Sequence, residues 1–168
     1  MKKILFLITV VFAALFISSC SKEGVSLTIK SKNLVGTWAL AHGYFYEEDD
    51  ETGEEEYVEM DIVEPPFNRK DRVYESDFTD DLFRYQEIVF TEYSMMVYEW
   101  DGDNYDEEKD ESYAVWFSYF GELEYHIRDN AIWIIGIKAY TIKKLTTKEL
   151  ILWDGEDETT IEVYHKKK

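Results

Sequence analysis

Carboxylate side chains are concentrated in two short segments of this 168-residue chain, EEDDETGEEEYVE at 47–59 and EWDGDNYDEEKDE at 99–111. Clustered carboxylate oxygens are the ligands that Ca²⁺ prefers. The second segment begins like an EF-hand loop, but it lacks the central glycine and the final glutamate of that motif. Three hypotheses remain: solvated hairpin loops, a docking surface for a basic partner, or a calcium site of another type at Asp101, Asp103 and Asp106.

The residues that most often perform catalysis are scattered along the chain. The histidines His42, His126 and His165 have no close pair, and no cysteine lies near them to complete a zinc site. No serine stands in a G-x-S-x-G motif. Because no catalytic constellation is present, we expect a protein that is not an enzyme and has no resident cofactor.

Cys20 is the only cysteine, and it stands where an apolar run gives way to a polar chain. Lys2 and Lys3 precede an apolar core at 4–17, which is the layout of a secretory signal peptide. This core is shorter than the ~20 residues that span a bilayer. Residues 1–19 are therefore predicted to be cleaved, and a lone cysteine in an exported protein has no disulfide partner in its own chain.

The cleavage region, Ile17-Ser18-Ser19-Cys20, resembles the lipobox of bacterial lipoproteins. This resemblance implies that Cys20 receives a diacylglyceryl thioether and, as the new N-terminus, a further acyl chain such as palmitate. More than one chain gives a durable membrane anchor. Ser21 implies the outer membrane, and Lys22-Glu23 resembles part of a surface-export signal of Bacteroidota lipoproteins, so the periplasmic face and the cell surface both remain open. Residues 20–32 are expected to form a flexible tether.

The overall charge limits the kinds of partner that this chain can bind. The formal net charge is −18, and removal of Lys2 and Lys3 would leave 16 basic residues against 36 acidic ones. Such a chain is repelled by nucleic acid and by anionic membrane surfaces, so we expect no nucleic-acid partner. A hydrophobic content of 45% with 17% aromatic residues argues against disorder and predicts one folded domain over 33–168.

Strand-like alternation dominates this domain, and no segment has a convincing helical period. In ELEYHIRD, for example, Leu123, Tyr125 and Ile127 share one face, and polar residues occupy the other. Eight to ten such segments alternate with the turn signals Asp101-Gly102, Asp129-Asn130 and Asp154-Gly155. The pattern favours an all-β, antiparallel up-and-down fold. We prefer a barrel to a sandwich, since closure removes exposed edges.

The segment NLVGTWAL resembles the Gly-x-Trp first strand of lipocalins, with Gly36 and Trp38 in the motif positions. YHIRDNAIWII, YTIKKLTTKELIL and IEVYHKKK are similar to later segments of the lipocalin-like lipoproteins of Bacteroidota. The resemblance implies an eight-stranded barrel with Trp38 at its closed end and a small apolar or amphipathic ligand at the open end. Lipocalins usually place an arginine over this tryptophan, whereas the last strand here offers only Lys166, Lys167 and Lys168.

Residues expected to line such a cavity lie on the strands that carry most aromatic side chains: His42, Tyr44, Met96, Tyr98 and Trp116. An eight-stranded barrel can also be filled by its own side chains, so an open cavity and a filled interior remain alternatives. If the rings face outward, the alternative function is an interaction module for a glycan or a basic protein. The long connection at 64–81, with the basic cluster NRKDR, is predicted to be an irregular loop that is either structural or functional.

Overall fold

The computed structural model describes residues 27–48, 55–62, 64–65, 67–77, 84–154 and 160–168. The predicted signal peptide, Cys20 and the first part of the predicted tether lie outside the described residues. The described chain consists mostly of β-strands, with one four-residue α-helix, α2 (Ser31–Leu34). The all-β fold class predicted from the alternation of apolar and polar residues is therefore confirmed.

Eight strands form a closed antiparallel barrel in the order β1-β4-β5-β7-β8-β9-β10-β11. Pairing of β1 with β4 closes the ring, with Gly36 opposite Phe90 and Ala39 opposite Glu87. The eight strands succeed one another around the ring in the order in which they occur in the chain, as in an up-and-down barrel. The barrel strands are β1 (Gly36–Glu48), β4 (Gln86–Phe90), β5 (Ser94–Asp106), β7 (Leu123–Arg128), β8 (Ala131–Ile134), β9 (Ile137–Leu145), β10 (Glu149–Asp154) and β11 (Thr160–Lys166).

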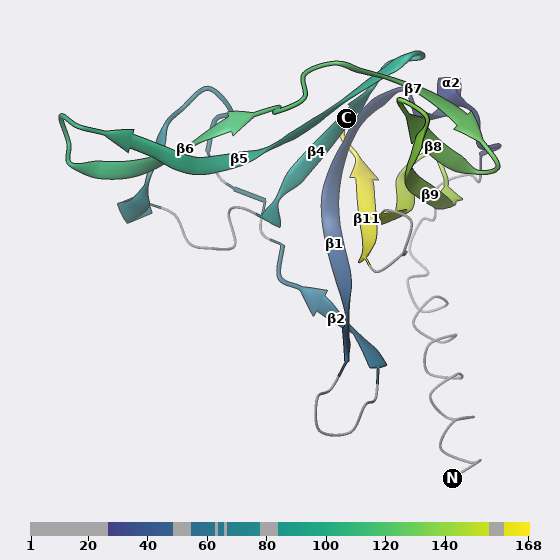
Figure 1. Cartoon of the computed structure of the whole chain (residues 1–168), viewed down its shortest axis with the longest axis horizontal. Helices are drawn as coiled ribbons and strands as arrows, with labels where there is room; N and C mark the ends of the chain where they lie inside the picture. Colours follow the sequence, from purple (N-terminus) through teal and green to yellow (C-terminus); the bar gives the residue numbers. More distant parts are fainter. Residues whose placement is uncertain (1–26, 49–54, 63, 66, 78–83, 155–159) are drawn as a thin grey trace, which may run out of the picture.

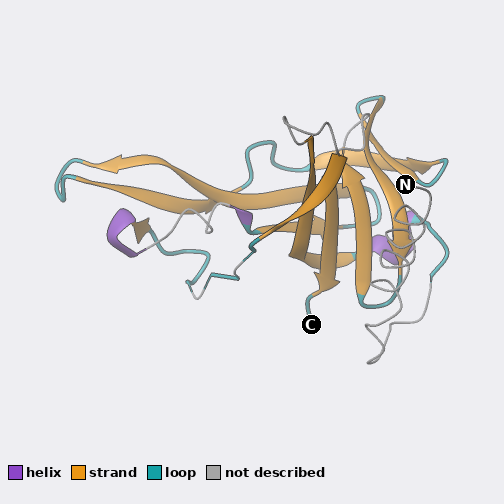
Figure 2. Ribbon diagram, turned by 90° about the horizontal axis from the view of Figure 1, so that it is seen from below, coloured by secondary structure: helices purple, strands orange, loops and turns teal. Residues whose placement is uncertain are grey.

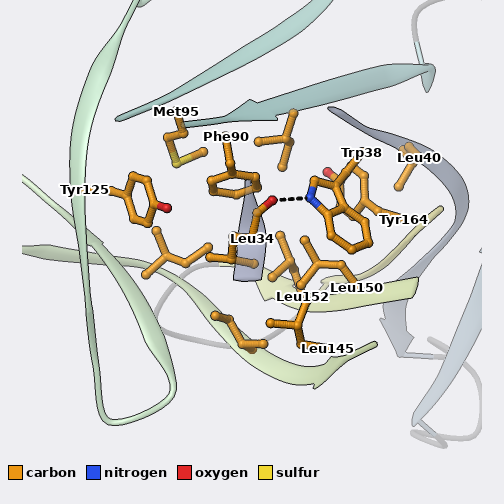
Figure 3. Packing of buried hydrophobic residues seen from close by; sticks show 13 residues of the cluster. Leu34, Trp38, Leu40, Phe90, Met95, Tyr125, Leu145, Leu150, Leu152 and Tyr164 are labelled. Atoms are coloured by element: carbon orange, nitrogen blue, oxygen red, sulfur yellow. Dashed lines mark hydrogen bonds between the residues drawn. The ribbon is translucent and has the colours of Figure 1, made fainter. Parts of the chain in front are cut away.

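The interior of the barrel is filled by apolar side chains (Figure 3). Every one of the eight strands contributes at least one side chain that is no more than 6% exposed. Close packing of this kind supplies most of the stabilisation of a domain of this size. The main contributors are Trp38, Leu40, Ile88, Phe90, Met95, Tyr125, Ile132, Ile142, Leu145, Leu150, Leu152 and Tyr164.

Trp38 and Leu34 close one end of the barrel. The indole Nε1 of Trp38 donates a 2.6 Å hydrogen bond to the carbonyl oxygen of Leu34, and both side chains are fully buried (Figure 3). Lys166 Nζ lies 5.0 Å from the Trp38 ring centroid and donates to the carbonyl of Val35 at 2.7 Å. The last strand therefore places a lysine over the tryptophan. A Cβ on Gly36, whose φ is +131°, would lie 2.7 Å from Lys166 Cε.

The last residues of the predicted tether pack against the closed end instead of extending from it. Leu27 N donates a 2.9 Å hydrogen bond to the carbonyl of Leu145, and Leu27 and Ile29 contact the core. Tyr125 Oη contacts the carbonyl of Ser31 at 3.5 Å. The alternation of Leu27 and Ile29 with polar residues explains this difference, because such a segment can cover an apolar surface.

Three further strands lie outside the ring, and two of them pair directly with barrel strands. β2 (Glu55–Met60) pairs with the distal half of β1, and β6 (Glu111–Phe117) pairs with β5 from Glu99 to Asp106. The distal part of β5 and all of β6, here called the arm (residues 100–117), project away from the barrel (Figures 1 and 2). β6 and β7 pair with the same edge of β5, so they form one long strand interrupted at residues 118–122.

The connection between β2 and β4 runs along this arm. We call its residues 64–77 the strap; they include β3 (Val73–Tyr74), which pairs with β6, and the 3₁₀ turn η1 (Glu75–Asp77). Val73, together with Phe67, covers Trp100 and Ala114 and forms a second, smaller apolar cluster. The strap is therefore held to the outside of the sheet by apolar contacts as well as by the pairing of β3.

Candidate functional site

A hollow with a volume of about 450 Å³ lies on the arm. Its walls come from β5, β6, η1 and the break before β7: Glu75, Trp100, Asp101, Gly102, Asp103, Ser112 and Tyr119. Three of these side chains are carboxylates, and none of the lining residues is basic. We call this feature the acidic hollow. Its negative charge would attract a lysine or arginine side chain of a partner.

An irregularity in β5 forms the floor of the acidic hollow. The pairing register with β6 shifts between Asp101 and Asn104, and Asp103 N donates to Asp101 Oδ1 at 3.1 Å. Asp101-Gly102 was predicted to be a hairpin turn, but it lies within the strand as a β-bulge. The turn follows β5 at 107–110, so most of the acidic segment 99–111 is strand and not loop. Bulges re-aim side chains, and this one turns both aspartates toward the hollow.

Tyr119 forms the wall of the hollow nearest to the barrel. The pKa of Tyr119 is raised to about 12. The main cause is desolvation of its hydroxyl, and smaller contributions come from Asp101 as a hydrogen-bond acceptor and from the negative charges of Asp101, Glu99 and Asp103. The phenol therefore stays neutral and can donate a hydrogen bond at any physiological pH. Its ring meets that of Phe117 edge to face, with 5.0 Å between centroids.

The predicted calcium ligands are divided between two places. Asp101 and Asp103 line the acidic hollow, whereas Asp106 accepts a 2.9 Å hydrogen bond from Tyr74 Oη and lies 3.6 Å from Arg72 Nη1. The bond from Tyr74 is the main cause that lowers the pKa of Asp106 below its usual value. In the part of the chain that the structure describes, no three His, Cys, Asp or Glu side chains lie close enough to hold a metal ion.

A second, much smaller hollow of about 50 Å³ separates the strap from the outer face of β4. Glu87, which is 1% exposed, accepts hydrogen bonds there from Tyr85 Oη at 2.7 Å, from Lys167 Nζ at 2.7 Å and from Arg69. Lys167 also donates to Glu64 Oε1 at 2.8 Å. Partial burial opposes the charge on Lys167, but its bonds to Glu64 and Glu87 raise its pKa above the usual value. This network fastens the strap and the end of the chain to the barrel.

Met96, Tyr98 and Trp116, predicted to line a cavity, lie on the outer face of the sheet. Met95 and Val97 on β5 contact the core. Because side chains alternate along a strand, Met96 and Tyr98 point to the opposite, outer face. The Tyr98 and Trp116 rings stack at 8° with 6.1 Å between centroids, and Trp116 also meets Trp100. These rings are partly covered, and Arg69 lies 5.6 Å from the Trp116 ring. Buried Trp100 Nε1 has no hydrogen-bond partner among the described residues.

His42 and Tyr44 were expected to share the inner face of β1 with Trp38. A bulge between Leu40 and His42 shifts the register against β11 and reverses the alternation. His42 thus stands opposite Val163 of β11, whose chain neighbours Glu162 and Tyr164 are buried. The side chain of His42 is 49% exposed. On the outer face His42 and Tyr44 both contact Glu59 Oε1, at 3.0 and 3.4 Å.

The chain has no match among the protein-family models, the curated proteins or the solved structures. Among the described residues, no helix has the length and apolar character needed to cross a membrane. The class that the fold and the site define is a closed eight-stranded antiparallel barrel with a projecting arm and an acidic hollow.

Proposed function

We propose that this protein is a lipid-anchored lipoprotein of the bacterial cell envelope whose acidic hollow binds a basic segment of a protein partner. The barrel serves as the scaffold, and the function is binding and not catalysis. The observation that carries the proposal is the acidic hollow itself, with Glu75, Asp101 and Asp103 around about 450 Å³ and no basic lining residue.

The packing of the barrel supports the interaction module over the small-ligand function among the alternatives that the sequence left open. A small apolar ligand would need space inside the barrel, whereas side chains from all eight strands fill the described interior. The candidate lining residues Met96, Tyr98 and Trp116 lie outside it, on a face that the strap partly covers. The resemblance to lipocalin-like lipoproteins thus supports the barrel and the anchor, and the arm supports binding of a basic protein.

The binding proposal is tested by removing the charge of the hollow. The doubly substituted protein Asp101→Asn/Asp103→Asn, purified with its lipid in neutral detergent, is titrated with a nonapeptide that alternates lysine and serine. We expect the dissociation constant to rise about tenfold, as for loss of two partly exposed ion pairs. The matched control is Glu92→Gln/Glu124→Gln, which removes two exposed carboxylates near the β4–β5 turn. Equal affinities of the two variants would contradict the proposal.

The anchoring proposal rests on Cys20 and is tested in cells. An alkynyl fatty acid supplied to bacteria that express the protein should label it, and the protein should sediment with membranes. Cys20→Ser should abolish both results, while Ser21→Ala should abolish neither. Labelling of the Cys20→Ser protein would show that the lipid is attached elsewhere, and failure of the wild-type protein to take up label would show that it is not a lipoprotein.

A further inference from the structure

The break between β6 and β7 presents three exposed aromatic side chains beside the acidic hollow. Phe117, Tyr119 and Phe120, here called the aromatic lip, are 45%, 52% and 77% exposed. Exposed aromatic groups of this kind commonly mark contact surfaces. We propose that the aromatic lip is the apolar half of the same binding site, so that the partner segment carries an apolar side chain next to its basic one.

The lip and the hollow share Tyr119, which joins them physically. Tyr119 lines the hollow together with Asp101, and its ring packs edge to face on Phe117 at 5.0 Å. A cation bound near Asp101 would therefore lie next to the Tyr119 ring, and its neighbours along the partner chain would reach Phe117 and Phe120. Cations next to aromatic rings gain a further attraction.

The local backbone holds the lip in an exposed position. Gly121, with φ of +61°, follows Phe120, and its N–H donates a 3.3 Å hydrogen bond to the carbonyl of Ser118. A Cβ placed on Gly121 would meet no atom within 4 Å, so the turn stands clear of the rest of the sheet. The tight turn keeps Phe120 on the surface, where an apolar side chain gains stability only by contact with another molecule.

The charge around the lip decides which class of molecule can cover it. Glu75, Asp101 and Asp103 line the hollow together with Tyr119 of the lip, and the whole chain has a formal net charge of −18. An anionic bilayer and a second copy of this chain would both be repelled at close range. A polypeptide segment with alternating basic and apolar residues satisfies both halves of the surface, and we take this as the occupant.

The proposal, which rests on the proposed function, is tested with two nonapeptides of equal charge. One alternates lysine with serine, and the other alternates lysine with leucine; empty detergent micelles serve as the blank. We expect the wild-type lipoprotein to bind the lysine–leucine peptide at least fivefold more tightly, a gain of about 1 kcal/mol by the usual conversion. Phe117→Ser/Phe120→Ser should reduce this preference to less than about twofold, because the lysine–leucine peptide loses its apolar contact surface.

Ile135→Ser/Ile137→Ser provides the matched control, because Ile135 in the β8–β9 turn and Ile137 at the start of β9 are 86% and 65% exposed. This variant should keep the preference, and far-UV circular dichroism should show that all three proteins are folded. Equal binding of both peptides to the wild-type protein would overturn the role of the lip alone. Loss of the preference in the isoleucine variant would also overturn it, since the attraction would then be non-specific. Failure of both peptides to bind would instead overturn the proposed function.

Discussion

At the scale of single residues, Glu162 of β11 is a carboxyl group whose protonation is coupled to the fold. It is 7% exposed, it accepts hydrogen bonds from Gln86 Nε2 at 2.8 Å and Tyr164 Oη at 2.9 Å, and Asp154 lies near enough to oppose its charge. Burial is the main cause that raises the pKa of Glu162 from 4.5 to about 7. The buried carboxyl therefore takes up a proton near neutral pH.

This shift predicts a pH dependence of stability with a definite sign. Because the pKa is higher in the folded state, the contribution is complete below pH ~4.5 and is lost as pH rises through about 7. Relative to Glu162→Gln, the wild-type protein should lose up to about 3 kcal/mol of unfolding free energy between pH 5 and pH 8. Urea denaturation of both proteins at the two pH values measures this difference. Identical pH dependences would show that Glu162 titrates normally.

At the scale of elements, the strap depends on the buried carboxylate of Glu87. Arg69 and Lys167 reach it from opposite sides, and their side chains are 46% and 32% exposed. Replacing one member of a buried ion pair leaves its partners without full compensation. The strap also carries Glu75 into the acidic hollow, so its attachment to β4 positions one wall of the candidate site.

Glu87→Gln should therefore loosen the strap before it unfolds the barrel. We expect a loss of about 2 kcal/mol, less than the ~3–5 kcal/mol typical of a fully buried pair, because both cations remain partly in water. Trypsin should cleave faster after Arg69, Lys70 and Arg72, and mass spectrometry identifies these sites. Glu92→Gln, an exposed carboxylate close by in the chain, is the control. Unchanged cleavage in Glu87→Gln would mean that apolar contacts alone hold the strap.

The strands could be predicted from the sequence because each buries one face. Leu123, Tyr125 and Ile127 were predicted to share the apolar face of one strand, and in β7 they are the less exposed residues. Asp129-Asn130, predicted to be a turn, connects β7 and β8 with positive φ values of 53° and 58°. Two irregularities in strand pairing that matter for the candidate residues could not be predicted, because a bulge inserts one residue without a distinctive sequence signal. One moves His42 to the outer face, and the other keeps Asp101-Gly102 inside β5.

The candidate site could be predicted only in part for the same reason. The acidic segment identified Asp101 and Asp103, and docking of a basic partner was one of its interpretations. Glu75, Ser112 and Tyr119 join them only through long-range pairing of β5 with β6 and through the course of the strap. Tyr119 also belongs to a segment that reads as a continuous strand, so the break that exposes it carries no local signal.

At the scale of the whole molecule, the closed end and the arm have different roles in the proposal. The described chain begins at Leu27, which bonds to Leu145 at the closed end. The seven residues from Cys20 to Ser26 can span at most about 25 Å, so a lipid on Cys20 would keep that end close to the membrane. The arm projects from the barrel, where a soluble partner can reach it (Figure 2).

The central claim is that the protein binds on its arm and not inside its barrel. The most direct test is to map the bound lysine–serine peptide by NMR, using the lipoprotein in neutral detergent and recording backbone amide shifts with increasing peptide. We predict that the largest shifts occur around the acidic hollow, at Glu75, Gly102, Asp103, Ser112 and Tyr119. Shifts concentrated in the barrel interior, at Ile132, Leu150 and Leu152, would contradict the claim.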